Sequence, residues 1–336
     1  MSAQSEGGRR AAVRIGVRCD AGVSSGVGHL VRCVALAEEL RARGAEVVFL
    51  GEVYGSPWAS AQLRERGLPL MAAPAAPVRL AALAWELRLD AVVLDSYELP
   101  AGTGTALRRA GLPVLAIVDG DPLGQEADLY LDQNLGAERR PFHPPGAAGR
   151  RLAGARYALL RDSVRRHRRE TRGEPVPRVL CFFGGTDSAG VAPAWARALR
   201  ETGQPFHATV VSPAPFAAGG PITVIPPTDR LPELMAGADL VVTAAGSAIW
   251  ELLYLGVPTA LSWVADNQLI GYEELVGRGA AAGLGRAADA EAVGLLARLL
   301  ADPAAREEHG RRGGGLVDGK GRERVADALL ALPGLS

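Results

Sequence analysis

The residue best suited to acid–base chemistry in this chain is His29, in the stretch SSGVGHLVRC from Ser24 to Cys33. The stretch follows an apolar strand-like segment and opens a helical pattern, where backbone N–H groups favour an anion. Its glycines do not complete the dinucleotide-binding fingerprint, because Val31 stands where the third glycine would be. One reading is a tight turn with an incidental histidine. The other places His29 in the first helical turn, facing a cleft, as a general base.

A second candidate stretch is FFGGTDSAG, which follows a strand-like segment in the second half of the chain. Gly184 and Gly185 let the backbone approach a ligand closely, and Thr186 can donate and accept hydrogen bonds. The alternative is a plain strand-to-helix turn in which Asp187 or Ser188 caps the helix. The two readings are compatible with each other.

Two further stretches in the second half carry groups that suit a nucleotide or a sugar. In TAAGSAIWELLYLGVP, Gly246 and Ser247 open a helix and present N–H groups to a phosphate. Glu251, four residues on, is either a ligand for two ribose hydroxyls or a solvent-facing helical glutamate. In ADNQLIGYEEL, Asn267 and Gln268 carry neutral amides that suit sugar hydroxyls, although simple capping of a helix explains them as well.

Strand-like and helix-like segments alternate along the chain with short connections, which predicts doubly wound parallel sheets. Two such halves predict an α/β fold of two Rossmann-like domains facing across a cleft, with ligands at the carboxyl ends of the strands. A Pro- and Gly-rich stretch at 138–151 is expected to be a surface excursion. The predicted units are a disordered tail at 1–12, a first domain at 13–165, a linker at 166–178, a second domain at 179–320 and a helix at 321–336 that packs back on the first domain.

The amino-acid composition argues against several classes of function. The 336 residues carry 37 Lys and Arg and 37 Asp and Glu, so charge gives no reason to expect nucleic acid or a membrane surface as partner. Cys19, Cys33 and Cys181 are far apart, which favours buried reduced thiols over a metal site. No apolar run is long enough to span a bilayer, and the first ten residues lack the apolar core of a signal peptide. We therefore expect a cytoplasmic protein.

These motifs, taken in order, resemble a known enzyme family. The series GSxxxE, GxP and DNQ is similar to the donor-binding half of GT-B nucleotide-sugar enzymes of the MurG type. The segment RCDAGVSSGVGHLVRCVALAEELRARG resembles the PseG/SpsG family, the UDP-2,4-diacetamido-2,4,6-trideoxy-β-L-altropyranose hydrolases of pseudaminic acid biosynthesis. VVLDSYEL, LYLDQNLG, GARYALLR, CFFGGTD, LMAGADLVVTAAGSAIWE and VADNQ follow in family order, so that the resemblance covers about residues 13–290.

The resemblance implies a GT-B fold and a metal-independent hydrolase without a cofactor. In this family water attacks the anomeric carbon, the C1–O bond breaks, and UDP leaves with inversion. His29 corresponds to the catalytic histidine of the family's GxGH motif, and Gly28 brings the backbone up to the scissile sugar. The resemblance further implies that Glu251 holds the ribose, while Asn267 and Gln268 face the sugar or its phosphates.

The first half departs from the family pattern more than the second half does. Arg18, Asp20, Asp95 and Tyr97 end strands of the first half and are expected to line the sugar pocket. In this half RCDAG stands for the family's RADAS, DSYE for DHYG, and VDGDPLGQEAD for a DDLADR-like stretch. The resemblance therefore specifies the nucleotide more firmly than it specifies the sugar.

Two other functions fit the same residues. The first is a GT-B glycosyltransferase in which His29 deprotonates a small-molecule acceptor, with a UDP-HexNAc type of donor, in a specialised metabolite pathway. The second is a nucleotide-sugar-binding partner protein without turnover. The oligomeric state is not encoded in any motif, and a monomer is the expectation.

Overall fold

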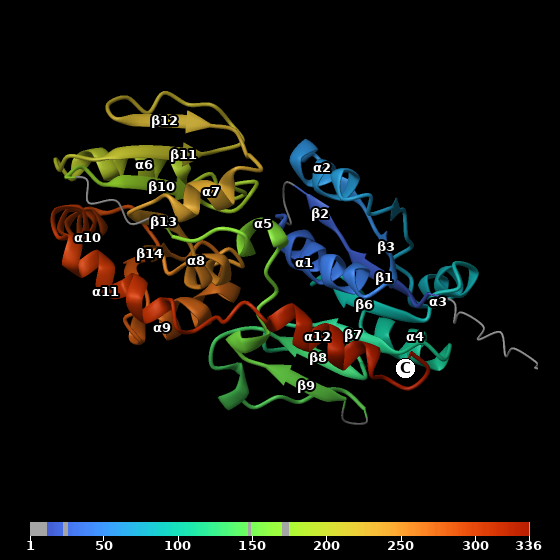
Figure 1. The fold of residues 1–336 in the computed structure, drawn as a ribbon. Helices are drawn as coiled ribbons and strands as arrows, with labels where there is room; N and C mark the ends of the chain where they lie inside the picture. Colours follow the sequence, from blue (N-terminus) through green and yellow to red (C-terminus); the bar gives the residue numbers. More distant parts are fainter. Residues whose placement is uncertain (1–11, 23–25, 147–148, 170–174, 336) are drawn as a thin grey trace, which may run out of the picture.

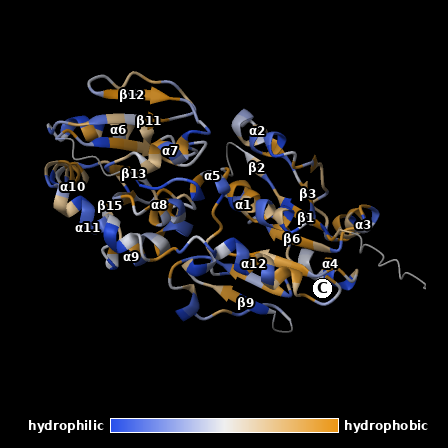
Figure 2. Ribbon diagram, in the orientation of Figure 1, coloured by the Kyte–Doolittle hydropathy of each residue, from blue (hydrophilic) through white to orange (hydrophobic). Residues whose placement is uncertain are grey.

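The computed structural model describes residues 12–22, 26–146, 149–169 and 175–335. The described residues form two α/β domains, each built on a parallel sheet with helices on both faces (Figure 1). Colouring by hydropathy shows apolar residues concentrated in the strands of both sheets (Figure 2). Except for residue 12, the tail predicted at 1–12 lies outside the described residues.

The sheet of the first domain has the strand order β5-β3-β1-β6-β7-β8-β9, and every neighbouring pair is parallel. Helices cover both faces, so its central strands are almost continuous apolar runs such as the AVVLD of β6. The strands are β1 (Arg14–Cys19), β3 (Glu46–Leu50), β5 (Leu70–Met71), β6 (Ala91–Asp95), β7 (Val114–Ile117), β8 (Leu129–Asp132) and β9 (Arg150–Ala153). A separate short parallel pair is formed by β2 (Ala21–Gly22) and β4 (Val53–Tyr54).

Two cores fill the two faces of this sheet. Leu30, Leu36 and Leu40 of the first helix are buried on one face. Leu80 and Leu107, from the third and fourth helices, are buried on the other. The helices are α1 (Gly28–Ala42), α2 (Pro57–Glu65), α3 (Pro77–Glu86), α4 (Thr103–Arg109) and α5 (Asp162–Arg165), with short 3-10 turns η1 (Ala137–Arg139) and η2 (Ala155–Tyr157).

The second domain repeats the architecture with the strand order β12-β11-β10-β13-β14-β15. Its strands are β10 (Arg178–Phe182), β11 (His207–Val211), β12 (Ile222–Ile225), β13 (Leu240–Ala244), β14 (Thr259–Ser262) and β15 (Ala282–Gly285). Its helices are α6 (Ala192–Glu201), α7 (Leu231–Ala236), α8 (Ile249–Leu255), η3 (Asp266–Gln268), α9 (Leu269–Gly277), α10 (Ala290–Ala301) and α11 (Pro303–Gly313). The predicted pair of Rossmann-like parallel-sheet domains is therefore confirmed.

Strand β9 and helix α11 are among the elements that the sequence did not predict. The stretch 138–151 is not only a surface excursion, because β9 begins in it and pairs in parallel with β8. Gly149 permits this approach, since a Cβ there would lie 2.1 Å from the Ala127 carbonyl oxygen. Helix α11 was not predicted, although Asp302 accepts hydrogen bonds from the N–H groups of its first turn and Pro303 begins it.

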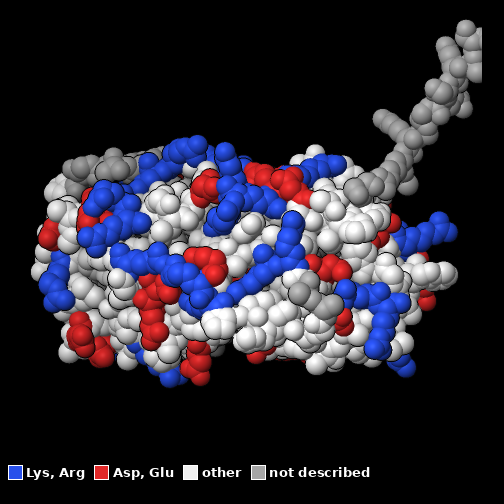
Figure 3. Space-filling model, turned by 90° about the horizontal axis from the view of Figure 1, so that it is seen from below, with Lys and Arg blue, Asp and Glu red and all other residues white. Residues whose placement is uncertain are grey.

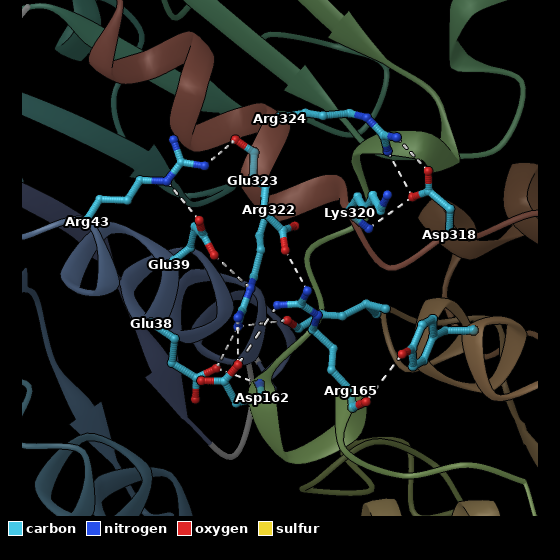
Figure 4. Close-up of polar contacts among 12 residues, drawn as sticks. Glu38, Glu39, Arg43, Asp162, Arg165, Asp318, Lys320, Arg322, Glu323 and Arg324 are labelled. Carbon is cyan, nitrogen blue, oxygen red and sulfur yellow. Dashed lines mark hydrogen bonds and ion pairs between the residues drawn. The ribbon is translucent and has the colours of Figure 1, made fainter.

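The last helix, α12 (Gly321–Leu330), lies against α1 of the first domain. Its Val325 and Leu329 belong to the core of that domain. Arg322 anchors the contact, because its buried guanidinium lies 3.3 Å from carboxylate oxygens of Glu38 and Glu39 and donates to Asp162 over 2.6 Å (Figure 4). The chain therefore returns to the first domain after completing the second.

Outside this cluster, charged side chains of both signs are mixed on the face of the molecule that Figure 3 draws. Seen from below, Lys and Arg lie side by side with Asp and Glu across both domains (Figure 3). Arg311 and Arg312, for example, both pair with Glu308 on α11. Such exposed pairs contribute little to stability, in contrast to the buried cluster around Arg322.

We expect Arg322→Ala to lower the free energy of unfolding by about 1–3 kcal/mol, because it removes the buried cation that Glu38, Glu39 and Asp162 share. The loss stays in this range because Arg66 still pairs with Glu38 and Arg43 with Glu39. Arg311→Ala is the matched control, since its side chain is 71% exposed and its loss should cost less than about 1 kcal/mol. Thermal and urea unfolding of both variants measure the difference. Equal stability of the two variants would contradict the anchoring role of Arg322.

Candidate active site

A cavity of about 590 Å³ lies between the two domains, at the carboxyl ends of their central strands. Its volume lies in the range of small-molecule sites, roughly 300–1,000 Å³. Both domains line it, and most of the residues predicted from the sequence are among the lining. These are Asp20, Gly28, His29, Tyr97, Gly184, Gly185, Thr186, Gly246, Ser247, Glu251, Asn267 and Gln268.

His29 lies in the first turn of α1, and its ring is oriented by Asp95. Its Nδ1 atom lies 2.5 Å from an Asp95 carboxylate oxygen at the end of β6. Burial alone would raise the pKa of Asp95, but Arg32 and His29 hold that pKa well below its usual range. Because an ionised carboxylate only accepts hydrogen bonds, Nδ1 carries the proton, which leaves the lone pair on Nε2. Within the described residues, Nε2 has no hydrogen-bond partner.

Arg32 joins Asp95 to a second buried acid. It donates to both carboxylate oxygens of Asp95, over 2.7 and 2.6 Å, and to Asp119 over 3.2 Å. Asp119 also accepts from the Tyr97 hydroxyl and, over 2.8 Å, from the Asn134 amide. Burial would raise the pKa of Asp119, but Arg32, Tyr97 and Asn134 outweigh it and lower that pKa. The network therefore keeps two carboxylates ionised beside the cavity.

The same network places Tyr97 against the histidine. The Tyr97 ring meets the His29 ring edge to face, with centroids 4.6 Å apart. Desolvation of its hydroxyl and the nearby charge of Asp119 raise the pKa of Tyr97, so that it stays protonated and donates. On the far side of the cavity, the Asn267 amide lies 3.4 Å from the same hydroxyl. Tyr97 thus bridges the His29 side of the cavity and the second domain.

Glycines allow the two domains to meet at the histidine. A Cβ on Gly28 would lie 2.9 Å from the Ser247 Oγ atom, and a Cβ on Gly185 would lie 2.6 Å from a methyl group of Val27. Larger residues at either glycine would hold the domains apart. The GVGH segment, the GG turn and the GS turn therefore converge on one point. Residues 23–25, which include both serines of SSGVGHLVRC, lie outside the described residues.

The second-domain wall offers backbone donors to the cavity. Within the described residues, the N–H groups of Ser247 and Ala248 donate to no protein acceptor, and both residues line the cavity. Thr186 also lines it, while Asp187 turns away and accepts from the N–H groups of Val191 and Ala192 at the start of α6. One turn thus exposes Thr186 to the cavity and uses Asp187 to accept hydrogen bonds at the start of α6.

Glu251 is buried rather than solvent-facing, with 3% of its surface exposed. It forms a two-pronged pair with Arg161 of the first domain, through Nε at 3.0 Å and Nη2 at 3.1 Å. The Gln268 side chain is also engaged, since its carbonyl accepts from the Val264 N–H group over 3.0 Å.

Two predicted pocket residues lie outside the cavity lining. Arg18 is buried beneath it, where it pairs with Asp20 over 2.6 Å. Asp95 is covered by His29 and Arg32, so it orients the histidine and is not part of the cavity lining. The expectation that both line a sugar pocket is therefore wrong, because their partners occupy the space in front of them.

Several polar lining residues were not predicted, among them Arg32, Asp119, Asn134 and Arg161. Arg32 follows His29 by three residues, which places both on one helical face, and this spacing was the available signal. Asp119 follows β7, the neighbour of the strand that ends at Asp95. Among the described residues, no three His, Cys, Asp or Glu side chains are arranged to hold a metal ion, and no helix is long and apolar enough to cross a membrane.

Comparison with known proteins identifies the fold. No protein-family model matches the chain. Acinetobacter baumannii MurG is similar in structure, with a TM-score of 0.68 and 16% identity over 95% of this chain and 100% of that one. The Streptomyces sp. SF2575 glycosyltransferase SsfS6, complexed with thymidine diphosphate, gives a TM-score of 0.63 and 17% identity over 94% and 99% of the two chains. The chain has the GT-B fold.

A curated relative gives no functional name. The uncharacterized protein MJ1062 of Methanocaldococcus jannaschii is 20% identical over 283 residues, which is 78% of this chain. The match spans 58% of the length of that relative. This relative therefore supplies no function for the site, and the function is inferred from the geometry of the site itself.

The buried acids predict a pH-dependent stability. The pKa of Asp119 is lowered by folding, so the unfolded state binds more protons in acid, and stability must rise with pH there. The contribution is present above the unfolded pKa of about 3.9 and is lost as pH falls through the folded pKa. We therefore expect Asp119→Asn to destabilise the protein at pH 7 by about 1–3 kcal/mol and progressively less below pH of about 4.

Urea unfolding of the wild type and of Asp119→Asn from pH 7 downward measures this difference. A destabilisation that stays constant down to the lowest pH at which the protein folds would show that Asp119 is not held ionised by the network.

Proposed function

We propose that this GT-B chain is a metal-independent UDP-sugar hydrolase. It releases UDP and a 2,4-diacetamido-2,4,6-trideoxy hexose with inversion, in the biosynthesis of pseudaminic-type nonulosonic acids. The observation that carries the proposal is the His29–Asp95 pair, whose free Nε2 atom faces a cavity closed on the other side by the GS turn. The sequence resemblance to the PseG/SpsG family supports the sugar, and the thymidine diphosphate in SsfS6 supports a nucleoside diphosphate in this fold.

The chemistry begins with water on the His29 side of the cavity. Nε2 takes a proton from the water as its oxygen attacks the anomeric carbon. The C1–O bond breaks on the opposite face, so the configuration inverts and the electron pair leaves with the diphosphate. The imidazolium that forms stays next to the Asp95 carboxylate, which stabilises it, as the acid does in a Ser-His-Asp triad.

The leaving diphosphate is placed on the second-domain wall. There the open N–H groups of Ser247 and Ala248 can donate to phosphate oxygens, and the glycines of the GG turn leave room for a close approach. Glu251 suits the two ribose hydroxyls, one turn further along α8. Donors fixed in advance stabilise charge on a leaving group without reorganisation.

The sugar is placed between the two walls, beside Tyr97 and the Asp119 network. Asn267 offers an amide group there, which can donate to and accept from acetamido substituents. The N–H groups of Asn134 are held by Asp119 and Asp132, so Asn134 can accept from such a substituent through its carbonyl. Tyr97 is 47% exposed and lies over the histidine, in a position to pack against the apolar C6 methyl group.

The second candidate is a glycosyltransferase with a small-molecule acceptor. MurG and the SsfS6 glycosyltransferase have similar structures, and that similarity favours transfer of a sugar as much as its hydrolysis. In this case His29 deprotonates an acceptor hydroxyl in place of water.

Incubation with UDP-2,4-diacetamido-2,4,6-trideoxy-β-L-altropyranose in the presence of EDTA tests the proposal. We expect stoichiometric UDP and free sugar, with UDP-N-acetylglucosamine as a poorer substrate. No release at high enzyme concentration would reject the hydrolase, and slow release that accelerates with an added acceptor would favour the transferase.

Substitution of His29 distinguishes an effect on the chemical step from an effect on nucleotide binding. We expect His29→Asn to lower kcat by at least about 100-fold, because the general base is lost. The UDP affinity should change less than about threefold, since the nucleotide lies on the other wall. Asp95→Asn should lower kcat as well, by about 100-fold or more, because the amide no longer fixes the tautomer. Turnover and UDP binding by calorimetry measure both effects, and an active His29→Asn enzyme would refute the assignment of the base.

A further inference from the structure

Helix α3 presents large apolar side chains to solvent. Among the exposed large apolar side chains of the described residues, Val78 at 77% and Trp85 at 76% are the most exposed, and both belong to this helix. The next in order is 50% exposed. Tryptophan is on average a highly buried residue, and exposed apolar surface marks sites of interaction. The outer face of α3 is therefore a candidate interaction surface.

The exposed residues of α3 form one stripe. Val78, Ala82 and Trp85 stand at positions i, i+4 and i+7, which share one face of a helix, and all three are exposed. We call these three residues the outer stripe. The other face of α3 is used by the core of the first domain, where Leu80 and Ala84 are buried. A helix that is apolar on both faces is normally covered on both.

Two charged residues flank the outer stripe on one side. Arg79 and Glu86 are seven residues apart, so they share a flank, with one near each end of the helix. Both are exposed, and neither has an ion-pair partner among the described residues. Their opposite charges cancel, so this flank gives no electrostatic attraction for nucleic acid or for an anionic membrane surface.

A two-fold axis makes this pattern complementary to itself. When two copies of α3 pair antiparallel about an axis at Ala82, Trp85 of each copy meets Val78 of the other. The same operation keeps the charged flanks on one side, so Arg79 of each copy lies opposite Glu86 of the other. The small side chain of Ala82 lets the two helices approach closely at the axis. Every contact then occurs twice, as in an isologous interface.

We propose that the outer stripe of α3 is the interface of a homodimer, formed by antiparallel pairing with a second copy of this chain. Helix α3 lies at the end of the first domain that points away from the second domain (Figure 1), and none of its residues lines the cavity. Both cavities of the dimer therefore stay open, and the inference is independent of the proposed function. An interface centred on one helix of 10 residues is small, so the dimer dissociates over the micromolar range.

Sedimentation velocity of the full chain tests whether the pair forms. We expect a species with twice the mass of one chain, whose share rises with protein concentration. Trp85→Gln should raise the Kd of the dimer at least about tenfold, because buried aromatic anchors carry most of the energy of an interface. A single species with the mass of one chain, at all concentrations up to about 1 mM, would overturn the inference.

Reversal of the flanking charges tests the antiparallel arrangement. Arg79→Glu and Glu86→Arg should each raise the Kd about tenfold, since each places like charges opposite one another at two symmetric positions. An equimolar mixture of the two variants should regain the affinity of the wild type, because every opposing pair then has opposite signs. Arg64→Glu is the matched control and should change nothing, since Arg64 is 73% exposed on α2, which covers the other face of the sheet.

Three further results would each overturn the proposal. One is a dimer whose Kd is unchanged by Trp85→Gln and by both charge reversals, because its interface then lies elsewhere. Another is a monomer that sediments with phosphatidylglycerol vesicles and loses this property in Trp85→Gln, because the stripe then contacts lipid. The third is a monomer in which the fluorescence removed by Trp85→Gln is shielded from acrylamide, because another part of the same chain then covers the stripe.

Discussion

The position of His29 at the cavity depends on the hydrogen bonds that Asp95 accepts at the end of β6. His29, Arg32 and Cys33, all in the first two turns of α1, donate to this one buried carboxylate. A buried charge is costly unless it is paired, and Arg32 pairs it over two short hydrogen bonds. The result is that α1 cannot rotate without breaking the pair, and the histidine ring keeps one orientation and one tautomer.

The second domain completes the site by close approach. Gly28 faces Ser247 and Gly185 faces Val27, so that the His29 side of the cavity and the second-domain side touch at their glycines. Contacts between side chains then fix the relation of the domains, among them Arg161 with Glu251 and Trp58 with Asp229 over 3.0 Å. Each of these contacts lies at the border of the cavity. The same residues therefore determine both how the two domains pack and how the cavity is shaped.

The sequence was informative where the signal is local. Apolar runs separated by helical patterns predicted both sheets, and glycines before helices predicted the turns that line the cavity. Strand β9 was missed because two of its four residues are arginines and prolines precede it. The contact between His29 and Asp95 could not be predicted from their spacing in the sequence, because it depends on β6 lying next to β1 in the sheet. Arg161 and Glu251 are 90 positions apart and meet only when the domains do.

Isotope labelling tests the central claim most directly, namely that water attacks the anomeric carbon of the nucleotide sugar with inversion. The reaction of the UDP-linked diacetamido sugar is run in water enriched in oxygen-18, and mass spectrometry locates the label while NMR identifies the anomer first formed. The account predicts one labelled oxygen in the sugar, none in UDP, and an anomer of inverted configuration. Label in the β-phosphate of UDP, or retained configuration, would contradict it.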